Sequence, residues 1–342
     1  HTPVALFPRE IDYTEWQTLR RYPILNWNMG MTYRLRERDE RVYPQGELAR
    51  RTIGQVGDKG NYGVEYVLRD VLEGRDGKAR RQRIARGFYG RVVGGDNSEP
   101  EDGLDVVTTL DLEMQDVADR ALRRQLEAQN ALWGTALVME VATGDLLAMA
   151  NLSRTKSGAY AEVKNHALSS RMEPGSTFKL AALLALVDDA GMSLDETFDT
   201  GNGARVKVGR TTVQDSHGLP PLNLKAAVAH SSNVFFARAV YETYKDDPER
   251  YVDYLRHLHL DRTVGLEEFG AVAPIFPAPG MKIWYPDVSI VNMGYGYAIE
   301  LTPLHTLTLY NAVANDGCMV APRLVREIRR GGEVVERPER RV

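Results

Sequence analysis

The sequence predicts an α+β fold, with helices packed on an antiparallel sheet. Residues 134–150 are apolar on both sides of a Thr143-Gly144 turn, which indicates a hairpin of buried strands. Asp111 is placed to cap a helix with an apolar stripe immediately before that hairpin. A continuous apolar run over 180–187 indicates a helix that is buried on every face. Helices packed on an antiparallel hairpin of this kind favour an α+β domain.

The 342-residue chain is long enough for two domains. Residues 1–104 are polar, rich in Arg and Gly, and lack long helical periodicity, which predicts short helices and hairpins. Within them, the basic stretch 78–91 is interpreted as a solvated hairpin in preference to a contact with lipid or a partner. The Gly- and Asp-rich run 94–103 predicts a linker. We therefore expect one domain over 1–104 and a second over 105–342.

The second domain is expected to open with a helix that follows Asp111. Its apolar stripe would consist of Met114, Val117, Ala118, Ala121, Leu122 and Leu126. After the hairpin and the buried helix, residues 222–244 predict two more helices. The first would end near His230, and a break at Ser231-Ser232-Asn233 would precede the second.

A serine and a lysine lie at the start of the buried helix. The segment Glu173-Pro-Gly-Ser-Thr-Phe-Lys179 places Ser176 after a Pro-Gly turn and Lys179 three residues later, so the two side chains share a face. A lysine desolvated there loses its proton more readily and can activate the serine as a nucleophile. The pair indicates acyl transfer. The alternative is an ordinary helix start capped by Ser and Thr.

The same spacing occurs at Ser153 and Lys156, which provides a comparison. The residues that follow, through Tyr160, have loop composition and no buried helix behind them. We therefore predict a solvated loop without a catalytic role at Ser153.

Ser231 and Asn233 are expected to project from the junction between the two later helices. In the functional interpretation Ser231 relays a proton, and Asn233 donates a hydrogen bond to substrate or to Lys179. The alternative is capping, because Ser and Asn favour helix ends. The two motifs together favour acyl transfer over capping.

Other signals carry less weight. Asp215-Ser216-His217 contains the residue types of a catalytic triad, but sequence neighbours do not converge as a triad does, so we predict a surface turn. His257 and His259 are two residues apart and make a poor metal pair. No metal or cofactor is expected. The net charge of −4 argues against a nucleic-acid partner.

Across about residues 40–327, the chain resembles the class B penicillin-binding proteins of bacterial cell-wall synthesis. Glu173–Lys179 is similar to the long form of their nucleophile motif, and Ser231-Ser-Asn-Val to their second motif. Three segments resemble motifs of the family's pedestal domain: Arg41-Val-Tyr-Pro-Gln-Gly-Glu-Leu-Ala, Ile53-Gly54 and Gly63-Val64-Glu65. Residues 102–115 resemble the entry into the family's transpeptidase domain, and residues 294–305 and 315–320 resemble the stretch before its third motif. Arg51-Thr-Ile-Gly, Met139-Glu-Val-Ala-Thr-Gly and Asp199-Thr-Gly-Asn-Gly are most similar to the division-type (FtsI-like) branch, particularly that of Bacteroidetes.

The resemblance implies a transpeptidase domain with the penicillin-binding, serine β-lactamase-like fold on an elongated, mixed pedestal. Ser176 would be the acylated nucleophile and Lys179 its general base. Ser231 and Asn233 would relay the proton and position the substrate, and the Ser176 N–H would be half of an oxyanion hole. The implied reaction is D,D-transpeptidation of peptidoglycan stem peptides ending in D-Ala-D-Ala, in septal wall synthesis. β-Lactams would acylate Ser176.

One departure from the family pattern concerns the third motif, Lys-[Thr/Ser]-Gly, which should follow Ser-x-Asn on an edge strand. Lys156-Ser157-Gly158 has these letters but precedes Ser176 and has loop composition. We therefore expect a fragment that is incomplete at its C-terminus and impaired in catalysis. The family's N-terminal anchor to the periplasmic face of the inner membrane is also expected to be missing. The implied partners are a membrane glycosyltransferase and division proteins.

Two alternatives remain open. A D,D-carboxypeptidase or β-lactamase would use the same serine but give the acyl group to water. A non-catalytic scaffold or β-lactam sensor would keep the fold alone. The long pedestal favours the transpeptidase, because the hydrolases commonly lack one.

Overall fold

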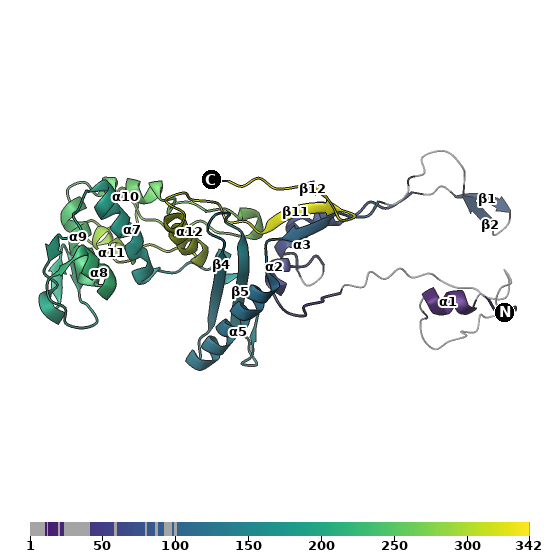
Figure 1. Ribbon diagram of the computed structural model, residues 1–342, viewed down its shortest axis with the longest axis horizontal. Coiled ribbons are helices and arrows are strands. Elements are labelled where there is room, and N and C mark those ends of the chain that lie inside the picture. The colour runs from purple at the N-terminus through teal and green to yellow at the C-terminus, as the bar shows by residue number, and fades with distance from the viewer. Residues whose placement is uncertain are drawn as a thin grey trace. The chain divides into compact units, whose positions relative to one another are not determined.

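The computed structural model describes residues 11, 13–19, 21–23, 42–57, 60–78, 81–85, 88–91, 98 and 101–341. The chain divides into two compact units, His1–Gln45 and Gly46–Val342. The described part of the first contains α1, Tyr13–Leu19. All other described elements belong to the second (Figure 1). The domain boundary between residues 104 and 105 stays a prediction, and most of the linker predicted over 94–103 lies outside the described residues.

The helices of the second unit are α2 Arg50–Ile53, α3 Gly63–Val67, α4 Arg69–Leu72, α5 Leu112–Gln129, α6 His166–Ser169, α7 Lys179–Leu184, α8 Leu224–His230, α9 Asn233–Tyr244, α10 Pro248–His257, α11 Ser289–Met293 and α12 Pro303–Ala314. Single turns are the 3-10 segments η1 Gly175–Phe178, η3 Gly201–Gly203 and η4 Glu267–Phe269, and the π-helical η2 Ala185–Asp189. Within the described ranges, every helix is too short or too polar to span a bilayer.

The strands are β1 Arg81–Ala85, β2 Phe88–Arg91, β3 Asp105–Thr108, β4 Trp133–Met139, β5 Leu146–Arg154, β6 Tyr160–Ala161, β7 Thr197–Phe198, β8 Val206–Val208, β9 Thr211–Val213, β10 Leu222–Asn223, β11 Val325–Arg330 and β12 Glu333–Glu336. They pair antiparallel in the orders β4-β5-β6, β12-β11-β3, β1-β2, β10-β7 and β8-β9. The hairpins predicted over 134–150 and within 78–91 are confirmed as β4-β5 and β1-β2.

Helices cover both faces of the β4-β5-β6 sheet, which confirms the α+β class. Successive side chains of a strand point to opposite faces. Accordingly, Ala148 and Ala150 pack with Ala118 of α5, whereas Met149 packs with Leu168 of α6 and Leu304 of α12.

The start of α5 is as predicted, but its predicted apolar stripe is partly wrong. The Asp111 carboxylate caps the helix by accepting from the Met114 N–H at 2.9 Å. Met114 and Val117 are 44% and 59% exposed, whereas Ala118 and Leu126 of the predicted stripe are buried together with Gln115, which the stripe did not include. The Gln115 Oε1 accepts from the Met149 N–H of β5 at 2.7 Å. This buried amide satisfies a strand edge, a role that apolar periodicity does not reveal.

A second, helical lobe surrounds α9 (Figure 1). Helix α9 contacts α7, α8, α10 and α11, and its Phe235 and Phe236 are fully buried. The predicted helix pair and its break are confirmed, since α8 ends at His230 and α9 begins at Asn233. The break therefore lies at the edge of this core, where Lys179 at the start of α7 donates to Ser231.

Candidate active site

The turn that carries Ser176 is held by close backbone packing. Gly175 has φ +55° and donates its N–H to the Gly296 carbonyl at 2.9 Å. Gly296 has φ +92°, and a Cβ atom there would lie 1.9 Å from the Gly175 carbonyl oxygen. Only glycine permits both this conformation and this approach. The Glu173 Oε1 accepts from the Ala298 N–H at 3.0 Å, which ties the same two segments together again.

Lys179 begins α7 directly beneath this turn, and its side chain is the centre of the site. The residue is 5% exposed, whereas Ser176 is exposed. The Nζ atom donates to Ser176 Oγ at 3.0 Å, to Ser231 Oγ at 3.1 Å and to Asn233 Oδ1 at 2.7 Å. The structure thus brings together all four residues that the two motifs singled out.

Burial of the Lys179 amine lowers its pKa to about 8, because the charged form is poorly solvated there. The negative charge of Asp215 acts in the opposite direction. About a tenth of the amine is therefore neutral at pH 7, and about half at pH 8. Its lone pair would lie within hydrogen-bond distance of the Ser176 hydroxyl, as a general base requires.

Ser231 reaches the lysine because its backbone is left-handed, with φ 52° and ψ 42° at the end of α8. The Ser231 carbonyl oxygen accepts from Lys179 Nζ at 2.5 Å, and the hydroxyl of the same residue is also in contact. One serine therefore supplies two oxygen atoms to the amine. Asn233, at the first position of α9, supplies a third.

The Penicillin binding protein transpeptidase domain matches this chain over residues 134–341. This chain belongs to the class B penicillin-binding protein transpeptidase family. Penicillin-binding protein PbpB of Mycobacterium tuberculosis is 30% identical over 305 residues, which are 84% of this chain and 43% of that protein. "Probable peptidoglycan D,D-transpeptidase PenA" of Neisseria meningitidis serogroup A is 27% identical over 292 residues, 82% of this chain and 48% of that protein. The chain therefore spans less than half the length of these curated relatives.

Penicillin-binding protein 3 of Mycobacterium tuberculosis, solved in complex with aztreonam, is similar in structure. It has a TM-score of 0.72 and 27% identity, covering 89% of this chain and 65% of that chain. The predicted penicillin-binding transpeptidase fold is confirmed by this likeness and by the family match.

The sequence interpretation missed Asp215. The expected surface turn holds for Ser216 and His217, which are exposed, but Asp215 is only 7% exposed. Its carboxylate accepts hydrogen bonds from the Ser232 hydroxyl at 2.8 Å and from the backbone N–H groups of Asn233 and Val234. The signal in the sequence was an acidic residue two positions after the short strand β9, but its partners are 17 to 19 residues away.

The loop predicted at Ser153 is also wrong. Ser153 lies on β5, half buried, and its Oγ is 2.7 Å from Nε2 of His166. Lys156 lies in the exposed turn between β5 and β6, so the second Ser-x-x-Lys spacing forms no pair. A strand directs Ser153 inward, whereas the turn that follows directs Lys156 to solvent.

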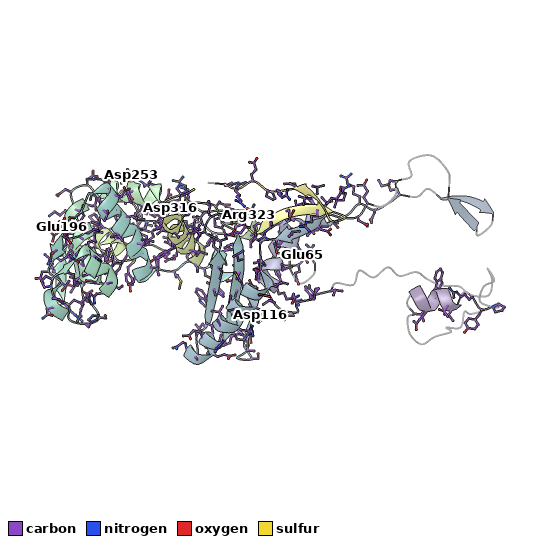
Figure 2. All side chains as sticks on the ribbon, viewed as in Figure 1. Glu65, Asp116, Glu196, Asp253, Asp316 and Arg323 are labelled. Atoms are coloured by element: carbon purple, nitrogen blue, oxygen red, sulfur yellow. The ribbon has the colours of Figure 1, made fainter. Side chains whose placement is uncertain are left out.

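Among the residues that the structure describes, no group of three or more His, Cys, Asp or Glu side chains is arranged to hold a metal ion. Figure 2 shows the acidic side chains Asp116, Glu196 and Asp253 on separate parts of the fold.

Proposed function

We propose that Ser176 is the acylated nucleophile of a peptidoglycan D,D-transpeptidase. The observation that carries the proposal is the 3.0 Å contact between Ser176 Oγ and the Nζ atom of Lys179, a buried amine of lowered pKa. The substrate is a stem peptide ending in D-Ala-D-Ala. The relationship to PenA supports this reaction class.

In the proposed acylation, neutral Lys179 takes the Ser176 hydroxyl proton while Oγ attacks the carbonyl carbon of the penultimate D-Ala. The backbone N–H of Ser176 donates to the developing oxyanion. The C–N bond then breaks, and the departing D-Ala amine receives a proton that passes from Lys179 through the Ser231 hydroxyl. The product is an ester on Ser176 plus free D-Ala.

In the second step an amine of a neighbouring stem peptide attacks this ester. A cross-link forms, and the Ser176 oxygen leaves as the hydroxyl with its proton restored. Asn233 contributes by position: its Oδ1 accepts from Lys179 Nζ and one Nδ2 hydrogen is directed at the Gln214 carbonyl, so the second Nδ2 hydrogen is left to donate to the substrate backbone. β-Lactams are proposed to form the same ester. Solved complexes of the similar penicillin-binding protein 3 with aztreonam and ampicillin support this.

Several finer assignments are part of the proposal, since the chain covers less than half of its curated relatives. We propose a septal, division-type role at the periplasmic face of the inner membrane, with a membrane glycosyltransferase and division proteins as partners. Support comes from the resemblance of the sequence motifs to the FtsI-like branch, particularly that of Bacteroidetes. A pedestal over 1–104 and a transpeptidase domain over 105–342 complete the assignment.

The test is covalent labelling of the full-length protein by a fluorescent penicillin, compared with Ser176→Ala. We expect an adduct that depends on Ser176, and release of D-Ala when lipid-linked peptidoglycan is supplied. Absence of a serine-dependent adduct would contradict every enzymatic interpretation. Rapid β-lactam turnover would instead assign a hydrolase, and an adduct without D-Ala release would assign a sensor.

A further inference from the structure

Asp215 is buried against the Ser231–Asn233 junction. It follows β9, and its carboxylate lies at the N-terminus of α9, a 12-residue helix. One oxygen accepts from the N–H groups of Asn233 and Val234, and the other accepts from the Ser232 hydroxyl. Ser232 in turn caps α9 by accepting from the Phe235 N–H at 3.0 Å. A charged acceptor at a helix N-terminus is stabilised by the helix dipole as well as by these bonds.

These contacts connect Asp215 to the lysine through one residue. Asn233 donates its backbone N–H to the Asp215 carboxylate, and its Oδ1 accepts from Lys179 Nζ at 2.7 Å. The neighbouring Gln214 carbonyl accepts from Asn233 Nδ2 at 3.4 Å. Any displacement of the Asp215 loop would therefore move the asparagine that orients the amine.

Asp215 also has an electrostatic relationship with Lys179. Of the side chains that contact Lys179 Nζ, Ser176, Ser231 and Asn233 are all uncharged. The Asp215 carboxylate raises the pKa of Lys179, and so opposes the lowering by burial. Two further titratable side chains lie near the junction: His217 and His230 are exposed, with ring centroids 6.4 Å apart.

We propose that Asp215 is a positioning residue that holds the Ser231–Asn233 junction against Lys179 and sets the pH range in which this lysine acts as a base. The inference rests on the proposed acylation of Ser176. In this proposal a single carboxylate, which belongs to neither motif, offsets the effect of burial on the protonation of Lys179. Its negative charge keeps Lys179 protonated up to a higher pH. Its three hydrogen bonds hold in place Ser231 and Asn233, whose oxygen atoms accept from the amine.

The experiment measures the second-order rate constant of penicillin acylation of the full-length protein from pH 6 to pH 10. Asp215→Asn keeps the shape of the side chain and removes its charge. In the plot of acylation rate against pH, the rising part at low pH (the acid limb) should move to lower pH. The ratio of the variant's rate to the parent's rate should therefore be at least about three times larger at pH 7 than at pH 9. Asp215→Glu, which retains the charge in a longer side chain, should lower the plateau rate without moving the limb in that direction.

Ser232→Ala is the matched control, because it removes one bond to Asp215 and the α9 cap but leaves the charge. It should lower the melting temperature and leave the pH midpoint unmoved. An unmoved limb in Asp215→Asn, or an equal shift in Ser232→Ala, would overturn the proposal. His217 and His230 are unchanged in all variants.

If Asp215→Asn does not fold, Asp215→Ser removes the charge and retains a capping hydroxyl. Failure of both neutral variants to fold would show that the carboxylate is needed for the fold itself, and would overturn its role in setting the pH range. These outcomes differ from a failure of the proposed function, in which the parent protein itself would show no Ser176-dependent acylation.

Discussion

The carboxylate of Glu162 accepts a hydrogen bond from the backbone N–H of Arg51 at 2.7 Å, joining residues 111 positions apart in the chain. Its other oxygen accepts from the Asn151 N–H of β5 at 3.4 Å. Glu162 therefore fastens α2 to the edge of the sheet that α5 and α6 cover. Burial raises the pKa of this carboxyl to about 7 despite the two hydrogen bonds.

The raised pKa of Glu162 predicts a specific pH dependence of stability. The folded state favours the protonated carboxyl, so this contribution to stability is complete below the ordinary pKa of 4.5 and is lost as pH rises through about 7. The loss should be on the order of 3 kcal/mol. Urea unfolding of the parent and Glu162→Gln at pH 4.5 and pH 8 measures it. A difference between the two proteins that does not change with pH would contradict the assignment.

His166 should have the opposite effect. It is buried, its ring stacks on Trp133 at 4.2 Å, and its nitrogens contact the hydroxyls of Ser153 and Ser170. Burial, followed by the charge of Lys164, lowers its pKa to about 4. Its contribution to stability is therefore present above 6.5 and lost as pH falls through 4.

The check is a comparison of His166→Gln with the parent by urea unfolding between pH 4 and pH 7. The parent should lose stability relative to the variant as pH falls, by on the order of 2–3 kcal/mol. Between pH 4.5 and 6.5 the slopes from Glu162 and His166 oppose each other, so the two variants should have slopes of opposite sign. Equal slopes would argue against both assignments.

Gly296→Ala should disable the nucleophile turn. The added methyl would lie 1.9 Å from the Gly175 carbonyl oxygen at a backbone with positive φ, so the two segments must separate. We expect a loss of about 1–3 kcal/mol in stability and at least about a tenfold fall in the penicillin acylation rate. Gly270→Ala is a matched control, since it too has positive φ but nothing within 4 Å of the new Cβ. An equal fall in rate in both variants would contradict a specific role for the Gly175–Gly296 contact.

Acylation of the parent protein should follow the titration of Lys179. Because the neutral amine is the base, the rate should rise with pH and level off above about 8. Lys179→Met should reduce the acylation rate by about a hundredfold or more and abolish its rise with pH. Stopped-flow labelling across the pH range, with circular dichroism to verify folding, provides the measurement. If the rate still rose with pH in Lys179→Met, the rise would have to come from another group.

Elements predicted from the sequence share one property, which is that their partners lie close by in the chain. The β4-β5 hairpin is set by two apolar runs and a short turn, and the Asp111 cap involves the N–H three residues on. The distance between Ser176 and Lys179 follows from their spacing across one helical turn. The apolar stripe of α5 was wrong at Met114 and Val117, because a polar contact of Gln115 with a distant strand fixed the rotation of the helix.

By itself the sequence determined the α+β class, the Ser176–Lys179 pair and the break that presents Ser231 and Asn233, since each depends on local spacing and hydrophobic period. The tertiary structure decided what surrounds them. It placed Asp215 under the junction and Gly296 against Gly175, contacts that span 18 and 121 residues. Such contacts form only when separate segments fold onto the same core, and no local pattern of residue types encodes them.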